Sequence, residues 1–294
     1  MYFYKKSVYI FLSGFMLFLA SCGNLRVQAA EQAEPFVANF QELEENHQAI
    51  LGVYAWNTEN GKIVAYGADR RFIYCSTFKV FLVGELLQQR SLEDLKEIVH
   101  YTQKDILAYA PLTSKSMDNG MSLGDLSAAA LRVSDNTAAN LLLEQIGGID
   151  ALKKSFRQLG DDVTEPVRPE PDLNETAPGD LRDTSTPRQL AVDLHAYLMG
   201  DILPEEKRQQ LQQWLSGNPF TDPLIKAGVP SGWIVIDKSG SGSYGTRNDI
   251  AMMIPPGKKP IILAIMTTHD KENAKSDNAL VAETAKLVIS QLAD

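Results

Sequence analysis

Residues 232–268, GWIVIDKSGSGSYGTRNDIAMMIPPGKKPIILAIMTT, decide how the chain folds. Three apolar runs, over residues 232–240, 246–255 and 259–268, are separated by segments rich in Gly, Ser and Pro. Runs of this length, with many β-branched residues and with turn residues at their ends, are typical of β-strands. The stretch therefore predicts three consecutive strands near the C-terminus.

Strands are also predicted at the other end of the chain, where ILGVYAW (50–56) and KIVAYG (62–67) flank the turn NTENG. This pattern predicts a hairpin, which follows an amphipathic helix over residues 35–49. Between residues 76 and 219 the apolar spacing is mostly helical, and a last helix closes the chain. The order predicts one α/β layer, built from both ends of the chain, with an all-helical block inserted between its strands.

The first 21 residues have the features of an export signal. Two lysines precede an apolar stretch over residues 8–20, which is shorter than the roughly 20 residues of a transmembrane helix. The stretch ends in LASC (19–22), which resembles the bacterial lipobox, in which the cysteine is lipidated. We therefore expect a signal over residues 1–21, a lipid on Cys22 that anchors the exported protein at the periplasmic or cell-envelope face of the membrane, and a linker over residues 22–34. Cleavage near VQAA (27–30) is the alternative.

The composition of the exported chain excludes several partners. Removal of the signal takes away two lysines and no acidic residue, so the formal charge of −9 becomes still more negative. An acidic chain without a basic stripe is not expected to bind nucleic acid. Cys75 is the only thiol left if Cys22 is lipidated, and the four histidines are too scattered for a zinc site. We expect a monomer with neither metal nor cofactor.

The segment FIYCSTFKVF (72–81) contains two possible nucleophiles side by side. On a helix, Ser76 and Lys79 are related by i,i+3 and Cys75 and Lys79 by i,i+4, so both pairs share a face. A buried lysine can lose its proton and activate a serine one turn away. Helical geometry alone does not choose between the thiol and the hydroxyl.

Two further short motifs each permit a purely structural interpretation. Ser134-Asp135-Asn136 precedes a helical pattern, and all three residue types are favoured N-caps. Lys238-Ser239-Gly240 stands at the end of a predicted strand, where it is either a glycine-rich turn or a place where backbone and cation approach a ligand. Taken singly, neither motif identifies a site.

Together, however, Ser-x-x-Lys, Ser-Asp-Asn and Lys-Ser/Thr-Gly, in this order, form the signature of penicillin-recognising serine enzymes. Their spacing resembles class A β-lactamases across the whole mature chain. The resemblance implies a two-subdomain β-lactamase-like fold of the α/β (α+β) class, an antiparallel sheet flanked by helices with an inserted all-helical subdomain. Residues 35–72 and 220–294 would form the α/β subdomain, and residues 73–219 the helical one.

A fourth motif distinguishes among these enzymes. RPEPDLN (168–174) lies within residues 160–185, which contain four prolines and no periodicity. It is similar to the Ω-loop of class A β-lactamases, expected here at about residues 165–183. In that family a Glu and an Asn at this spacing hold the hydrolytic water, which implies Glu170 and Asn174, and an ion pair closes the neck of the loop, which implies Arg168 and Asp183.

The resemblance also implies a role for each remaining residue. Ser76 would be the nucleophile, with Lys79, Glu170 or both accepting its proton, and Ser134 would pass a proton to the leaving nitrogen while Lys238 keeps the region positive. The backbone N–H groups of Ser76 and Ser241 would form the oxyanion hole. The substrate would be bound by Tyr109, Asn136, Asn174, Ser239, Gly240, Ser241 and Arg247.

The implied function is hydrolysis of penicillins and cephalosporins through an acyl-enzyme, which gives antibiotic resistance. The alternatives are a D,D-peptidase or a β-lactam sensor, which are acylated without rapid turnover. Family members that hydrolyse carbapenems often join the Cys before the nucleophile to a second Cys, and Gly242 stands at that second position. We therefore expect penicillins and early cephalosporins as the main substrates.

Overall fold

The structure, a computed structural model, describes residues 36–175, 177 and 179–292. Its contacts divide the chain into two compact units, with the boundary between residues 41 and 42. Residues 36–47 are helical, as the amphipathic pattern predicted. The predicted signal, the lipidated Cys22 and the linker over residues 22–34 lie outside the described residues. In the part of the chain that is described, no helix is both long and apolar enough to span a membrane.

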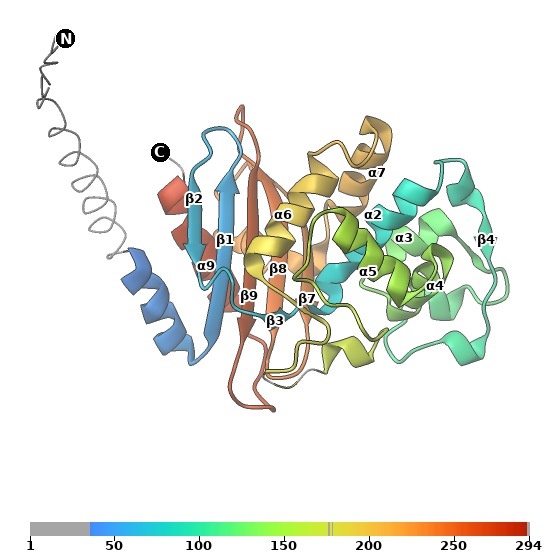
Figure 1. Cartoon of the computed structure of the whole chain (residues 1–294), viewed down its shortest axis with the longest axis horizontal. Coiled ribbons are helices and arrows are strands. Elements are labelled where there is room, and N and C mark those ends of the chain that lie inside the picture. The colour runs from blue at the N-terminus through green and yellow to red at the C-terminus, as the bar shows by residue number, and fades with distance from the viewer. Residues whose placement is uncertain (1–35, 176, 178, 293–294) are drawn as a thin grey trace, which may run out of the picture. The chain divides into compact units, whose positions relative to one another are not determined.

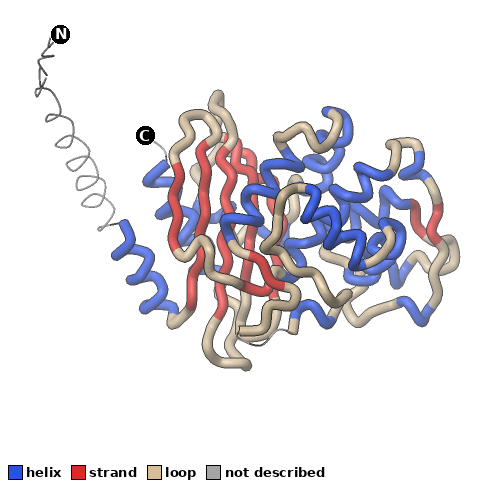
Figure 2. The backbone as a smooth tube through the Cα atoms, in the orientation of Figure 1, coloured by secondary structure: helices blue, strands red, loops and turns tan. Residues whose placement is uncertain are grey.

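The second unit contains a five-stranded antiparallel sheet in the order β2-β1-β9-β8-β7 (Figures 1 and 2). β1 pairs with β9 over its whole length, so the N-terminal hairpin and the three C-terminal strands form one sheet. The strands predicted from residues 50–67 and 232–268 are thereby confirmed, and so is the antiparallel α/β class. The five strands are β1 (Ile50–Asn57), β2 (Ile63–Tyr66), β7 (Ile234–Ser241), β8 (Arg247–Ile254) and β9 (Ile261–Thr268).

The helical block lies between β2 and β7 in the sequence, as predicted. Thr186 caps its longest helix by accepting a hydrogen bond from the backbone of Gln189, and Pro187 occupies the first turn. The predicted subdomain boundaries at residues 72/73 and 219/220 stay a prediction. The helices of the described chain beyond residue 47 are α2 (Lys79–Gln89), α3 (Leu123–Arg132), α4 (Asn136–Ile146), α5 (Ile149–Gln158), α6 (Pro187–Leu198), α7 (Glu205–Leu215), α8 (Ile225–Gly228) and α9 (Asn278–Leu292).

Several short elements carry no periodic signal and were not predicted. β3 (Phe72–Ile73) pairs with β6 (Thr184–Ser185), and β4 (Ile98–Val99) pairs with β5 (Met121–Ser122). Two-residue strands are too short for an alternating pattern, so only the fold reveals them. The pairing of β3 with β6 ties the end of the proline-rich loop to the chain just before Ser76.

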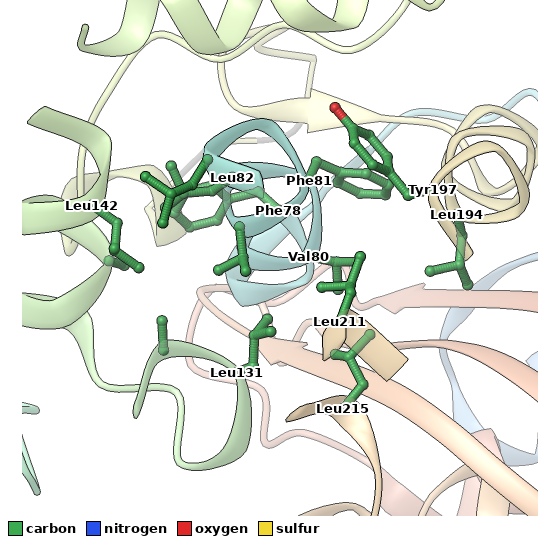
Figure 3. Close-up of a cluster of buried hydrophobic side chains, with 14 of the residues drawn as sticks. Phe78, Val80, Phe81, Leu82, Leu131, Leu142, Leu194, Tyr197, Leu211 and Leu215 are labelled. Carbon is green, nitrogen blue, oxygen red and sulfur yellow. The ribbon is translucent and has the colours of Figure 1, made fainter. Parts of the chain in front are cut away.

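The apolar helix α2 lies at the centre of the core (Figure 3). Its first turn differs from the predicted regular helix, because residues 75–78 form a 3-10 turn, η1 (Cys75–Phe78), and the α-helix begins only at Lys79. Neighbouring helices surround α2 closely: a Cβ on Gly84 would lie 2.5 Å from the ring of Tyr197 on α6. Each fully buried leucine or phenylalanine here stabilises the fold by about 1.5–3 kcal/mol. The packing fixes α2, and with it the position of Lys79. The side chains labelled in Figure 3 are Phe78, Val80, Phe81, Leu82, Leu131, Leu142, Leu194, Tyr197, Leu211 and Leu215.

Both faces of the sheet are covered by helices. Ile262, Ala264 and Met266 of β9 belong to the same core cluster as α2 and α6. The alternate residues of β9 are also fully or almost fully buried and point to the opposite face, where α9 contacts β9 (Figure 1). The sheet is therefore the middle layer between α6 and α9.

Two carboxyl groups face each other in the core. Asp161, next to the proline-rich loop, accepts hydrogen bonds from the backbone N–H groups of Val163 (2.6 Å) and Thr164 (2.9 Å) through Oδ1. Asp193 on α6 accepts a hydrogen bond from Gln189 Nε2 through Oδ1 (2.9 Å), and the side chains of Asp161 and Asp193 are both buried. Burial, with the nearby charge of Asp161 as a second cause, raises the pKa of Asp193 from 3.8 to about 9. At neutral pH Asp193 therefore keeps its proton.

The proton that Asp193 keeps predicts a free energy of unfolding that falls as the pH rises. The folded chain holds the proton more tightly than the unfolded chain, so the stabilisation is complete below pH 3.8 and is lost as the pH rises toward about 9. Asp193→Asn supplies an amide N–H in place of the proton, and its melting temperature should fall less between pH 6 and pH 9 than that of the wild type. Thermal unfolding at several pH values measures this. Asp118→Asn, at an exposed carboxylate, is the control. If the melting temperatures of all three proteins change equally with pH, Asp193 does not keep its proton in the folded chain.

Candidate active site

The segment around Ser76 holds the two candidate nucleophiles in different environments. Ser76 is half-buried at the wall of a cavity of about 420 Å³, whereas Cys75 is fully buried and faces Gly242. Burial, together with the negative charge of Glu170, raises the pKa of the Cys75 thiol far above its usual range. Attack by a cysteine needs the thiolate, so the environment of Cys75 disfavours it as a nucleophile. Cys75 is instead a buried packing residue.

Lys79 and Glu170 form a buried ion pair directly beneath Ser76. Lys79 Nζ lies 2.9 Å from Glu170 Oε1, and neither side chain is exposed. Ser76 Oγ donates a hydrogen bond of 3.3 Å to the same Oε1 atom. One carboxylate oxygen therefore contacts both the hydroxyl and the ammonium group, which makes both Lys79 and Glu170 possible acceptors of the serine proton.

Lys79 has further hydrogen-bond acceptors at the start of α4. Its Nζ donates to the backbone oxygen of Ser134 (2.9 Å) and to Asn136 Oδ1 (2.7 Å). Burial lowers the pKa of Lys79, while the nearby Glu170 opposes the shift. A lowered pKa makes the neutral amine of Lys79 more accessible, and the neutral amine is the form that can accept a proton from Ser76.

Glu170 is held by two asparagines. Asn174 Nδ2 donates to Glu170 Oε2 at 2.5 Å. Asn140 on α4 contacts the Glu170 backbone twice, donating to its oxygen (2.8 Å) and accepting from its N–H (3.0 Å). The buried Oδ1 of Asn174 has no hydrogen-bond partner within the described part of the protein. Asn140 was not predicted as a site residue, although Asn140 lies four residues after Asn136 and so on the same face of α4.

The neck of the loop is closed around Asp183. Arg168 Nε lies 2.5 Å from Asp183 Oδ2, and Asp183 Oδ1 accepts from the backbone N–H groups of Val167 (2.8 Å) and Arg168 (3.0 Å). The hydroxyl of Tyr74, two residues before Ser76, donates to the same Oδ1 (3.1 Å). The expected pair of Arg168 and Asp183 thus forms, and the buried Asp183 ties the loop to the nucleophile segment.

Asp135 explains why the Ser-Asp-Asn motif resembles a helix cap. Its buried carboxylate caps α4 by accepting from Ala138 N (2.9 Å), and it also accepts from Thr113 N (3.0 Å). The capping interpretation therefore holds for Asp135, while its neighbours Ser134 and Asn136 line the cavity. Ser134 adopts φ of +57°, a left-handed conformation that is uncommon for a residue with a Cβ.

The opposite wall of the cavity is the end of β7. Lys238 Nζ donates to Ser134 Oγ (3.1 Å), so Ser134 lies between two lysines. Burial and the positive charge of Lys79 lower the pKa of Lys238 to about 7. A Cβ on Gly240 would lie 3.0 Å from the Ser76 backbone nitrogen, so glycine permits β7 to approach the nucleophile this closely.

Arg247 begins β8 directly opposite Ser241 of β7. Its Nε donates to Asn278 Oδ1 (2.9 Å) at the start of α9, a partner that sequence analysis did not find. Tyr109 lies at the mouth with 49% of its surface exposed. The cavity is lined by Ser76, Tyr109, Arg132, Val133, Ser134, Asn136, Asn174, Asn218, Phe220, Lys238, Ser239, Gly240, Ser241 and Arg247.

Ten of the predicted site residues therefore meet around one cavity. Lys79 and Glu170 lie behind its wall, and the pair of Arg168 and Asp183 lies at the loop neck. Arg132, Val133, Asn218 and Phe220 also line the cavity and were not predicted. A serine beside a buried lysine and a buried carboxylate, next to a strand end, defines a serine hydrolase of the acyl-transfer type.

Comparison with known proteins gives the family. Residues 35–292 match the model of the β-lactamase enzyme family. The chain is 48% identical over 279 residues to a β-lactamase of Bacillus licheniformis, covering 93% of this chain and 91% of that protein, and 49% identical over 253 residues to one of Bacillus amyloliquefaciens, covering 86% and 83%. A solved class A β-lactamase of Clostridium kluyveri superimposes with a TM-score of 0.87 at 52% identity, covering 88% of this chain and 99% of that one. The chain belongs to the class A β-lactamase family and is a serine β-lactamase, a hydrolase of cyclic amides.

The two neighbouring nucleophiles predict opposite results on substitution. Ser76→Ala should abolish turnover of a chromogenic cephalosporin, with a loss of about 10³-fold or more in kcat, because Ser76 Oγ is the hydroxyl that contacts the buried Glu170 carboxylate. Cys75→Ala should retain most activity, and the wild type should resist inactivation by iodoacetamide, because the thiol is buried and protonated. Rapid inactivation by iodoacetamide, or loss of activity in Cys75→Ala, would return the nucleophile to Cys75.

Asn140 gives a second prediction. Asn140→Leu removes both hydrogen bonds to the Glu170 backbone, at a cost of about 1–3 kcal/mol for each group left unsatisfied. We expect a lower kcat, with acyl-enzyme accumulating during turnover because Glu170 is less well held. Stopped-flow kinetics and intact-protein mass spectrometry measure this, and Asn273→Leu, at an exposed position, is the matched control. Unchanged kcat in Asn140→Leu would contradict the positioning role.

Proposed function

We propose that this protein hydrolyses penicillins and early cephalosporins through an acyl-enzyme on Ser76, and so confers resistance to these antibiotics. The observation that carries the proposal is the single oxygen Glu170 Oε1, which contacts both Ser76 Oγ and Lys79 Nζ in a buried site. Such a carboxylate can act first near the serine and later on a water molecule. An enzyme that only becomes acylated needs no such base.

Acylation begins when Ser76 Oγ attacks the lactam carbonyl carbon. Its proton passes to Lys79, to Glu170 or to both, since each lies within reach of the site. The developing oxyanion is stabilised by the backbone N–H groups of Ser76 and Ser241, at about 3 kcal/mol for each donor. The proximity of β7 to Ser76 at Gly240 supports this arrangement, because it brings the two N–H groups to the same wall.

The ring opens when the C–N bond breaks. Ser134 donates its proton to the leaving nitrogen and regains one from the lysines, both of which contact Ser134 Oγ (3.1 Å from Lys238 and 3.4 Å from Lys79). Lys238 also keeps this part of the cavity positive. The substrate carboxylate is bound by Ser239, Ser241 and Arg247, and the substrate amide by Asn136 and Asn174, while Gly240 and Tyr109 complete the wall and the mouth.

Deacylation requires a water molecule on the Glu170 side of the ester. Glu170 accepts a proton from the water, whose oxygen attacks the acyl carbon. The bond between the acyl carbon and Ser76 Oγ then breaks, and the proton passes from Glu170 to Ser76 Oγ, which restores both groups. The buried Asn174 Oδ1 supports this step, because it is an acceptor with no partner from the described protein chain next to Glu170. The ion pair of Arg168 and Asp183 keeps the loop that carries both residues in place.

The N-terminal segment completes the proposal. We infer from the sequence alone that the chain is exported, that Cys22 carries a lipid, and that the enzyme is a membrane-anchored monomer facing the periplasm or cell envelope. Metabolic labelling with a fatty-acid analogue tests the anchor, because Cys22→Ser should remove the label and release the activity from the membrane fraction.

Removal of Glu170 tests the reaction itself. Wild-type protein should turn over a chromogenic cephalosporin many times, whereas Glu170→Ala should give a stoichiometric burst and an acyl-enzyme that mass spectrometry detects on the peptide containing Ser76. Glu175→Ala, which removes an exposed carboxylate of the same loop, should turn over like the wild type. A burst without turnover in the wild type would favour a sensor or a D,D-peptidase, and steady turnover by Glu170→Ala would show that another group is the base.

A further inference from the structure

A second groove opens beside the catalytic cavity. It has a volume of about 850 Å³ and lies between α3, the segment over residues 112–122 and the turn η6 (Pro219–Thr221). Its apolar wall includes Ile98, Leu112, Met121, Val133 and Phe220. None of the groups assigned above to the chemistry lines this groove, so the proposed reaction does not account for it.

The groove adjoins the catalytic cavity. Arg132, Val133, Asn218 and Phe220 line both. Arg132 and Val133 directly precede Ser134, which faces the leaving nitrogen in the proposed reaction. Asn136 and Asn174, which would hold the substrate amide, line the cavity but not the groove. A substituent that enters the groove must therefore come from the half of the substrate that carries the ring and its carboxylate.

Three exposed apolar side chains stand in the walls of the groove. Phe220 is 60% exposed, Ile98 is 49% exposed and Leu112 is 39% exposed. Exposed apolar side chains that gather in one groove mark binding sites more often than single ones do. Phe220 lines both hollows, so it stands between them.

The backbone at Phe220 and at Leu112 is hydrogen-bonded to residues next to the catalytic groups. The Phe220 N–H donates to Asn218 Oδ1 (2.9 Å), and the adjacent Thr221 donates to Asp237 Oδ1 (3.1 Å), the neighbour of Lys238. The Leu112 N–H donates to Asp135 Oδ2 (3.0 Å), between Ser134 and Asn136. Both apolar side chains are therefore held at a fixed place relative to the reacting groups, as a selective contact requires.

We propose that this groove binds an aromatic substituent on the carboxylate-bearing ring of cephalosporins, and that Phe220 is the residue that determines this specificity. The inference rests on the proposed function and adds a substrate class to it. An aromatic substituent on the ring carbon next to the one with the carboxylate leaves the cavity past Asn218 and stacks on Phe220. Leu112 contacts its far side, with a smaller share of the binding.

The test compares two cephalosporins that share one acylamide side chain. One carries a methyl group on the ring carbon next to the carboxylate-bearing carbon, and the other carries an arylthiomethyl group there. Phe220→Ala should lower kcat/KM for the aryl compound, relative to that for the methyl compound, by about tenfold, since buried aromatic contacts dominate such sites. Phe220→Trp should preserve the ratio, and Leu112→Ala should lower it by about threefold. Ile63→Ala, at a residue 50% exposed on the edge strand β2, should leave the ratio unchanged.

The outcomes separate the two proposals. If wild-type protein hydrolyses both compounds and Phe220→Ala changes their kcat/KM values equally or not at all, the groove does not bind the ring substituent. If the ratio falls as much in Ile63→Ala as in Phe220→Ala, the effect is not local and the assignment is overturned as well. If wild-type protein turns over neither compound, the proposed function fails, and the assignment fails with it.

Discussion

Lys79 and Glu170 face each other at 2.9 Å with neither side chain exposed, and much of the surrounding structure serves to hold them. A buried ion pair is stable only when its geometry is good and the remaining hydrogen-bonding groups are satisfied, and loss of one partner costs about 3–5 kcal/mol. The protein meets this condition from three elements. α2 brings the lysine, the loop before α4 brings its acceptors, and the proline-rich loop brings the carboxylate.

The need to hold Lys79 and Glu170 together explains why the loops around them are anchored to the rest of the protein by polar contacts. Asp183 closes the neck of the proline-rich loop with its carboxylate, and Asn140 holds the backbone of Glu170 from α4. Asp135 fixes the segment that carries Ser134 and Asn136. These three polar side chains, of which Asp135 and Asp183 are buried, thus replace the ladder of hydrogen bonds that a helix or strand would provide, because a misplaced Glu170 would leave Lys79 without its counter-ion.

The fold was predictable wherever a segment was long and periodic. The five strands of the sheet and the helical block appear as expected, since their patterns extend over many residues. The 3-10 turn at residues 75–78 and the pairing of β3 with β6 were not predictable, because each spans too few residues to show a period. Both lie next to Ser76, where the fold departs most from regular structure.

What the sequence by itself determined is the chemistry: four short motifs, carried on strands, helices and one loop, indicate a class A β-lactamase because their combination is far more specific than any one of them. What only the tertiary structure decided is the environment of each group. The motifs implied Ser76 as the nucleophile, and the structure adds that the neighbouring Cys75 is buried, which raises the pKa of its thiol. The contacts of Asn140 with Glu170 and the place of Phe220 beside the cavity depend on segments far apart in the chain. Burial and long-range contact arise only when the chain is packed, and no local pattern encodes them.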